Sequence, residues 1–303
     1  MRIADAHTHF FSRQFFKLLA EEAARAKGGD PDALLLELAR KAAMELPEES
    51  PSQHARRWLS ELDRHGIDRA VAFASLPGEA PAVKEACLST NGRLIPFVLV
   101  NPTTAAALQA GRAALSEEGF RGALLFPSLH RFDPSDPALD PLYSEVAARR
   151  ALVVVHCGLL QIKLRDLLGI RPPYDLRHAN PLLVAAAAER HRRAAFVIPH
   201  FGAGFFREAL LAGAQCENTY LDTSSSNSWM RFQAEDLTLE KVFRKALDAF
   251  GPRRILFGTD SSTFPRGYRS DILESQRRAL DAVGLSKPDQ ARIFGENLSE
   301  LLS

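Results

Sequence analysis

The sequence contains few cysteines and no thiolate motif. Only three of its 303 residues are cysteine, and no two of them form a CxxC pair. An odd set of three does not indicate a disulfide framework, and zinc sites ligated by thiolates are usually built from such pairs. The sequence therefore argues against a disulfide-stabilised scaffold and a cysteine-ligated zinc site, and it fits a reducing cytoplasm.

The sequence also lacks an excess of either charge and any long apolar run. Lys and Arg number 38 against 37 for Asp and Glu, so the chain has no basic field to attract nucleic acid or an anionic membrane. No apolar segment approaches the roughly 18 residues of a membrane helix. The start, Met1–His7, has neither the charged region nor the apolar core of a secretory signal. We therefore expect a cytoplasmic protein that acts on a small molecule.

Short apolar segments alternate with longer segments of helical period along the whole chain. This alternation is typical of parallel βα units, and eight such units predict an α/β fold of the TIM (β/α)8 barrel type. We expect a single barrel domain over residues 1–303. The predicted strands are Arg2–His7, Arg69–Ser75, Leu94–Val100, Gly122–Phe126, Ala151–His156, Ala195–His200, Thr219–Asp222 and Ile255–Gly258.

Two segments exceed what a minimal barrel needs. Residues 11–51 hold an extra helical stretch, which predicts a helical insertion after the first strand. Residues 158–180, after the fifth strand, contain Arg171-Pro172-Pro173-Tyr174 and are expected to be largely loop. Because both segments follow strand ends, we expect both to overhang the catalytic face of the barrel.

Five side chains able to bind a metal stand where predicted strands end. His7 and His9 lie two residues apart on the first strand, so both can point to the same face, and Asp5 shares their parity. His156, His200 and Asp260 follow the fifth, sixth and eighth apolar runs. Catalytic groups of TIM barrels come from such strand ends. A lone histidine is more often structural, but five coincidences at one face predict a metal site.

Four motifs in a fixed order give the chain a family resemblance. They are Asp5–Phe10, Val155–Gly158, Ile198–Gly202 and Phe257–Asp260. With these motifs the chain resembles the amidohydrolase superfamily, in the branch of aminocarboxymuconate semialdehyde decarboxylase, nearly from end to end. The resemblance implies a TIM-barrel enzyme with a divalent metal, and its relatives often form homodimers.

The resemblance also implies roles for individual residues. His7, His9, His156 and Asp260 would surround the metal, and His200 would be a catalytic group beside it. Imidazoles with a carboxylate suit zinc, while manganese, iron or cobalt would also fit. Relatives with two ions bridge them by a carboxylated lysine on the fourth strand. The corresponding segment here has no lysine, so we expect one ion.

The resemblance leaves the reaction open. The first hypothesis is a hydrolase that cleaves a small ester, lactone or amide with a metal-activated water, with Asp260 as the base and His200 polarising the substrate. The alternative is a lyase, a metal-dependent nonoxidative decarboxylase of an aromatic or unsaturated carboxylic acid. A hypothesis of another class is a barrel that binds a ligand without catalysis.

Candidate substrate-binding residues come from two loops. The loop after the fifth strand holds Arg171, Tyr174, Arg177 and His178, where an arginine could bind a carboxylate with two hydrogen bonds. The alternative for these residues is a solvated surface. Trp229, after the seventh strand, is the remaining candidate for the wall of the substrate pocket.

Overall fold

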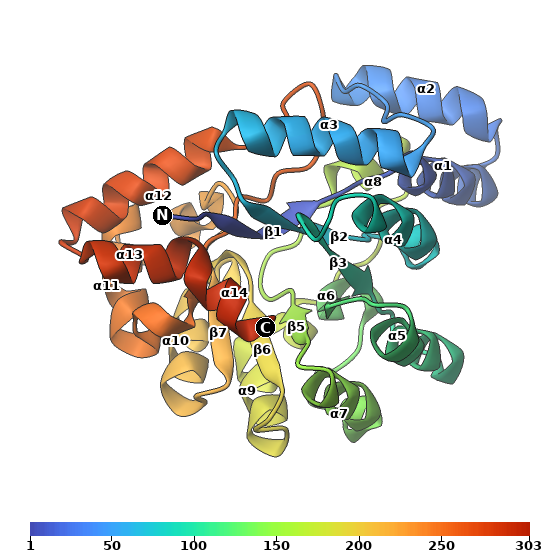
Figure 1. The fold of residues 1–303 in the computed structure, drawn as a ribbon. Coiled ribbons are helices and arrows are strands. Elements are labelled where there is room, and N and C mark those ends of the chain that lie inside the picture. The colour runs from blue at the N-terminus through green and yellow to red at the C-terminus, as the bar shows by residue number, and fades with distance from the viewer.

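The computed structural model describes all 303 residues, and its core is one parallel sheet. The eight strands pair in chain order from β1 to β8 (Figure 1). Their bounds are β1 Ala4–His9, β2 Arg69–Phe73, β3 Leu94–Leu99, β4 Gly122–Leu125, β5 Leu152–Val155, β6 Ala195–Ile198, β7 Thr219–Asp222 and β8 Ile255–Leu256. The residues after β8 also bond to β1, because Asp260 N donates to His7 O at 2.9 Å and His9 N donates to Ser261 O at 2.8 Å. The predicted TIM barrel is confirmed.

Helices surround the sheet. Their bounds are α1 Arg13–Lys27, α2 Pro31–Ala42, α3 Pro51–Arg64, α4 Ala80–Leu88, α5 Ala105–Glu117, α6 Pro127–His130, α7 Asp140–Ala148, α8 Lys163–Leu168, α9 Pro181–Arg190, α10 Phe206–Gln215, α11 Leu239–Phe250, α12 Ser270–Ala282, α13 Lys287–Ala291 and α14 Asn297–Leu301. No helix has both the length and the apolar character that crossing a membrane requires.

Alternation along the strands divides the apolar residues between two cores. In β5, Val153 and Val155 belong to the large cluster between sheet and helices, whereas Leu152 and Val154 belong to the cluster inside the barrel. By the same alternation Cys157 is buried in the outer cluster, and His156 faces inward. Strand parity thus directs the histidine to the barrel axis.

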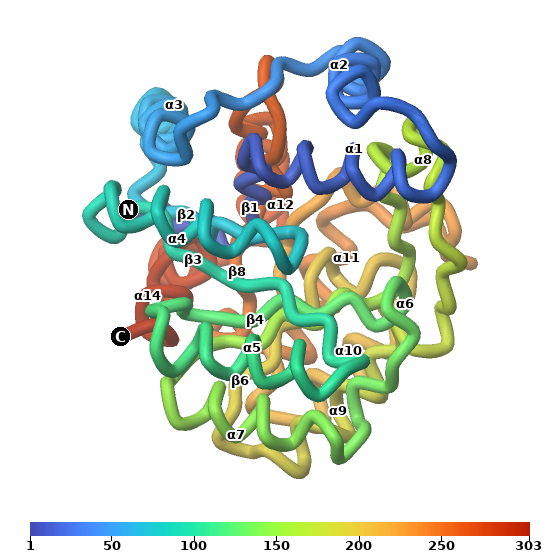
Figure 2. Tube along the Cα trace, turned by 90° about the vertical axis from the view of Figure 1, so that its right-hand side faces the viewer, coloured from blue at the N-terminus to red at the C-terminus, as the bar shows by residue number.

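Two helices of the segment after β1 form a cap with α8. The helices α1, α2 and α8 lie together over one end of the barrel (Figure 2). They share a small apolar core that includes Phe16, Leu38 and Leu168. Arg165 of α8 donates to both carboxylate oxygens of Glu22 on α1, at 2.5 and 2.9 Å. We call α1, α2 and α8 the cap.

The segment after β5 is largely loop, as expected, but it contains one short α-helix. This helix, α8, forms because Leu164, Leu167 and Leu168 find an apolar partner in the distant cap core. The last helical segment of the chain is broken at Gly295. This glycine lies against β1, where an added Cβ would be 2.7 Å from Arg2 O.

Candidate metal centre

The two histidines of β1 have defined hydrogen-bond partners. His7 Nδ1 lies 2.6 Å from Asp222 Oδ2, and His9 Nδ1 lies 2.7 Å from Ser75 Oγ. With each Nδ1 engaged, each Nε2 is left toward Asp260 Oδ1, at 3.9 Å for His7 and 3.4 Å for His9. Hydrogen bonds of this kind to Nδ1 fix the ring of a metal-binding histidine and leave the other nitrogen for the ion.

The third member of the group is Asp260, after β8. Its backbone has a φ of 61°, a left-handed conformation that is uncommon outside glycine and recurs at functional sites. Its side chain is 37% exposed, toward the cavity. The ligand atoms of His7, His9 and Asp260 all lie within 4.8 Å of one another. This group could hold a divalent metal.

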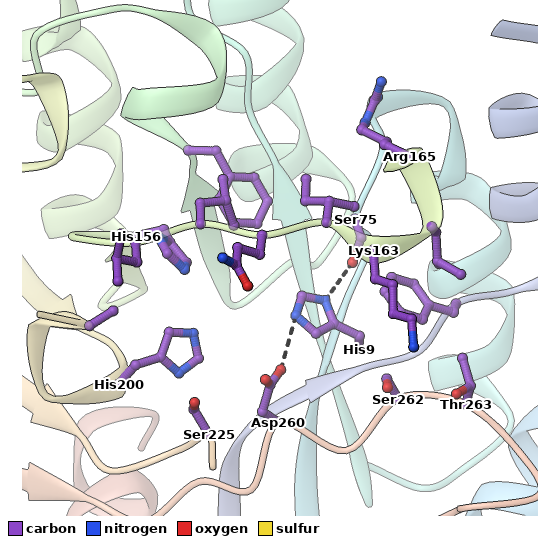
Figure 3. A pocket seen from close by; sticks show the side chains of 18 of the residues that line it. His9, Ser75, His156, Lys163, Arg165, His200, Ser225, Asp260, Ser262 and Thr263 are labelled. Carbon is purple, nitrogen blue, oxygen red and sulfur yellow. Dashed lines mark hydrogen bonds and ion pairs between the residues drawn. The ribbon is translucent and has the colours of Figure 1, made fainter. Parts of the chain in front are cut away.

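His156 and His200 lie beside this group (Figure 3). The His200 ring is 4.7 Å from the His7 ring and 5.1 Å from the His156 ring, measured between centroids. His200 Nδ1 lies 2.8 Å from Ser224 Oγ, whereas His156 Nδ1 is buried without a hydrogen bond. His156 lies outside the tight group of three, so its role as the fourth ligand stays a prediction.

Asp5 does not take part, although it shares the parity of His7 and His9. The register of β1 against β2 shifts between Asp5 and Thr8. A shift of this kind re-aims the side chains that follow it. The carboxylate of Asp5 instead accepts hydrogen bonds from Thr259 Oγ1 at 2.6 Å and from His7 N at 2.9 Å. It therefore joins the ends of β1 and β8 beneath the site.

The protonation of three of the four histidines suits a metal, whereas for His7 burial is outweighed by the charge of Asp222 and the hydrogen bond to it, which raise the pKa. Burial lowers the pKa of His9 to about 4, and burial, followed by the charge of His200, lowers the pKa of His156 well below its usual value. Burial also lowers the pKa of His200. Metals bind the neutral imidazole, so these groups need not lose a proton first at neutral pH. Neutral imidazoles, one carboxylate and the unpartnered His156 nitrogen fit a borderline divalent ion.

The structure adds a carboxylate that the sequence argument missed. Asp222, at the end of β7, is buried and accepts from His7 and, at 2.7 Å, from Ser224 N. Gly258 makes room for this pair, since a Cβ there would lie 2.7 Å from Asp222 Oδ1 and 2.9 Å from His7 Cβ. The strand-end rule that singled out Asp260 applies equally to Asp222. Ser75 and Ser224 carry no comparable signal in the sequence.

A cavity of about 550 Å³ opens above these residues, beneath the cap. Half of the residues that line it are hydrophobic, and its only acidic side chain is Asp260. Its cationic side chains are Lys163, Arg165, Arg231, Arg266 and Arg269. Arg165 and Arg269 pair with Glu22 and Asp271, whereas the other three form no ion pair. In Figure 3, Lys163 reaches from α8 toward Ser262 and Thr263.

Four of the five predicted substrate residues lie outside this cavity. Arg171, Tyr174, Arg177 and His178 are not among the residues that line it. Arg177 is 85% exposed and pairs with Asp175 at 2.7 Å, so the loop satisfies this charge internally. Trp229 is buried in the cavity wall, and its contact with a substrate stays a prediction.

The family assignment agrees with this geometry. The model of the Amidohydrolase family matches residues 4–302 of the sequence. The chain belongs to this amidohydrolase family. It is an enzyme, a metal-dependent hydrolase or carboxy-lyase. No curated protein sequence shows significant similarity to this amidohydrolase.

Solved structures share the fold of this amidohydrolase over almost its full length. The 5-carboxyvanillate decarboxylase of Sphingomonas paucimobilis has a TM-score of 0.64 and 12% identity, covering 99% of this chain and 98% of its own. The 5-carboxyvanillate decarboxylase of Novosphingobium aromaticivorans, complexed with manganese and a nitrobenzoic acid, has a TM-score of 0.65 and 16% identity. The match covers 99% of this chain and 96% of that enzyme. A protein of Acinetobacter baumannii, described as a probable 2-pyrone-4,6-dicarboxylic acid hydrolase, has a TM-score of 0.59 and 16% identity. The match covers 100% of this chain and 99% of that protein.

Proposed function

We propose that this amidohydrolase is a metal-dependent nonoxidative decarboxylase of a small aromatic or unsaturated carboxylic acid. The observation that carries the proposal is the charge of the cavity, which has five cationic side chains, three of them unpaired, against the single carboxylate of Asp260. Arginine and lysine bind carboxylates, and the apolar half of the wall suits a hydrocarbon ring or chain. The sequence alone favoured hydrolysis of a small ester, lactone or amide, and a substrate of that kind without a carboxylate would give these cations no anion to bind.

One divalent ion would be held by His7, His9, His156 and Asp260. The histidine-rich donor set suits zinc, and manganese is present in two decarboxylases of the same fold. When bound, the ion supplies a Lewis acid that polarises substrate oxygens. The absence of any lysine or acid from Gly122–Leu125 supports one ion per chain.

The proton chemistry falls to Asp260 and His200. Asp260 Oδ1 faces the β1 histidines, which leaves Oδ2 free to hold a proton. The carbon that loses the carboxyl group takes this proton, the bond to the carboxyl carbon breaks with its electron pair left on the first carbon, and carbon dioxide leaves. Asp260 regains a proton from solvent on its exposed side. His200 Nδ1 is hydrogen-bonded to the Ser224 hydroxyl at 2.8 Å. With the hydroxyl as the donor, Nε2 would carry the ring hydrogen and would donate it to a substrate oxygen.

Hydrolysis is the second candidate because Asp260 is open to water. Its side chain is 37% exposed, so a water molecule can reach the carboxylate and give up a proton to it. A carboxylated lactone would satisfy both this observation and the cationic wall. The cavity accommodates either substrate, and the two reactions differ in their products.

Product analysis separates the two reactions. The metal-loaded enzyme is incubated with a panel of hydroxybenzoic acids, unsaturated dicarboxylic acids and carboxylated lactones in heavy water enriched in oxygen-18. We expect one carbon dioxide per substrate consumed and deuterium on the carbon that carried the carboxyl group, both lost in Asp260→Asn. Oxygen-18 in the organic product without carbon dioxide would establish hydrolysis instead.

A further inference from the structure

A histidine outside the metal group also faces the cavity. His130 is the last residue of α6, directly after β4, and lines the cavity that holds Asp260. Its Nδ1 is buried without a hydrogen bond, and its Nε2 has no hydrogen-bond partner either. By contrast His54, a buried histidine of α3, bonds through both ring nitrogens. His130 is therefore a polar group whose hydrogen bonds the protein itself does not supply.

Phe126 lies near both His130 and the metal group. The ring of Phe126 lies 5.4 Å from the ring of His156 and 6.5 Å from the ring of His130. Phe126 is therefore a ring neighbour of both histidines, and all three side chains line the same cavity as Asp260. A ligand with its reacting carboxyl group at the metal residues and a ring against Phe126 shares this cavity with His130.

The charge around His130 restricts what it can bind. Burial, followed by the charge of Arg165, lowers the pKa of His130 to about 4. Arg165 is held in place by its two hydrogen bonds to Glu22. At neutral pH the imidazole is uncharged, with one donor and one acceptor nitrogen. Such a ring suits a neutral hydroxyl or carbonyl group, whereas Lys163 and the arginines suit a carboxylate.

We propose that His130 is a specificity-determining residue that hydrogen-bonds a hydroxyl or carbonyl substituent on the side of the substrate remote from the reacting carboxyl group. This inference rests on the proposed function, because it takes the reacting group to lie at the metal residues. A purely structural histidine at this position would only fill space, which phenylalanine also does. The two roles therefore predict different relative affinities for ligands with and without a hydroxyl substituent.

The test measures binding of benzoate, 3-hydroxybenzoate and 4-hydroxybenzoate to the metal-loaded protein by calorimetry. We expect the wild type to bind one hydroxybenzoate about tenfold more tightly than benzoate, as one added hydrogen bond allows. His130→Phe should lose this preference while its benzoate affinity stays within about twofold. His130→Gln, which keeps a donor and an acceptor, should retain part of it. His178→Phe, outside the cavity, is the matched control.

Two outcomes would overturn the role of His130: no preference in the wild type, or an undiminished preference in His130→Phe. Melting temperature and metal content establish that the variants are folded and loaded. Should His130→Phe not fold, the same comparison is made with His130→Ala. The proposed function fails separately, if benzoate binds equally well after metal removal and to Asp260→Asn.

Discussion

Asp222 and Ser75 determine which nitrogen each β1 histidine presents. Asp222 takes the Nδ1 hydrogen of His7, and Ser75 engages Nδ1 of His9. Burial opposes the charge of Asp222, but the charge of His7 and the hydrogen bond to it lower the pKa of Asp222, which favours the carboxylate. Both Nε2 atoms are thereby aimed at the space beside Asp260. The site depends on residues that never touch the ion.

Replacing Asp222 should weaken the metal site. In Asp222→Asn the amide is a poorer acceptor for His7, so the ring loses its fixed orientation, and we expect metal affinity to fall about 10- to 100-fold. Competition with a coloured chelator measures the change. Asp271→Asn, on an exposed carboxylate that pairs with Arg269, is the control. An affinity in Asp222→Asn equal to that of the wild type would rule out the orienting role.

Glu79 supports the second histidine and should make stability depend on pH. It is fully buried and accepts hydrogen bonds from Ser12 and from Ser75 N, the backbone of the residue that engages His9. Burial raises the pKa of Glu79 from 4.5 to about 7. The folded protein thus holds this proton more tightly than the unfolded chain, so the stabilisation is complete below pH 4.5 and is lost as the pH rises to about 7.

The variant Glu79→Gln isolates this effect. The stability of the wild type relative to the variant should fall between pH 4.5 and 7, by on the order of 3 kcal/mol at most. Denaturant unfolding at several pH values measures the difference. Glu85→Gln, on the nearby exposed face of α4, should leave the slope unchanged. A wild-type curve parallel to that of Glu79→Gln would refute the raised pKa.

At the scale of elements, the cap is a separate packing unit on the barrel. Its core is distinct from both barrel cores. Within the cap, Arg165 of α8 is joined to Glu22 of α1, and α8 carries Lys163 at the cavity. Because α8 is only six residues long, its place depends on α1 and α2. Destabilising α2 should therefore increase local unfolding of the cap above the cavity before it affects the barrel.

Leu38 on α2 tests this dependence. Its side chain is fully buried, so Leu38→Ala should cost the cap about 2–5 kcal/mol. Hydrogen exchange should then accelerate in α1, α2 and α8 while the strands stay protected. Leu36→Ala, on the same helix with a side chain 64% exposed, should leave exchange unchanged. Equal acceleration in cap and strands would mean that the cap is not a separate unit.

Sequence patterns predicted regular elements better than the connections between them. The strands were recognisable because each is a short apolar run, and periodicity revealed helices such as α5 and α11. The helix α8 escaped because its apolar residues meet their partners about 130 residues away, in α1 and α2. The position of the loop arginines outside the cavity could not be predicted for a similar reason, since a loop's composition does not say which side chains its own carboxylates neutralise.

At the scale of the whole molecule, closure of the barrel assembles the site. Strands far apart in sequence end at one face, so His7, His9, His200 and Asp260 meet there, and this could be predicted from strand ends alone. The charge of the cavity could not be predicted, because it depends on which loop cations lack partners in three dimensions. That charge, rather than the metal residues, supports a carboxylated substrate.

Metal stoichiometry tests the central claim most directly. Elemental analysis of the purified protein, after incubation with zinc or manganese and removal of excess ion, should give one divalent ion per chain. His7→Ala and His156→Ala should each reduce this content strongly, and His178→Ala, outside the cavity, should not. Two ions per chain, or no bindable ion in the folded wild type, would contradict the mononuclear centre on which the account depends.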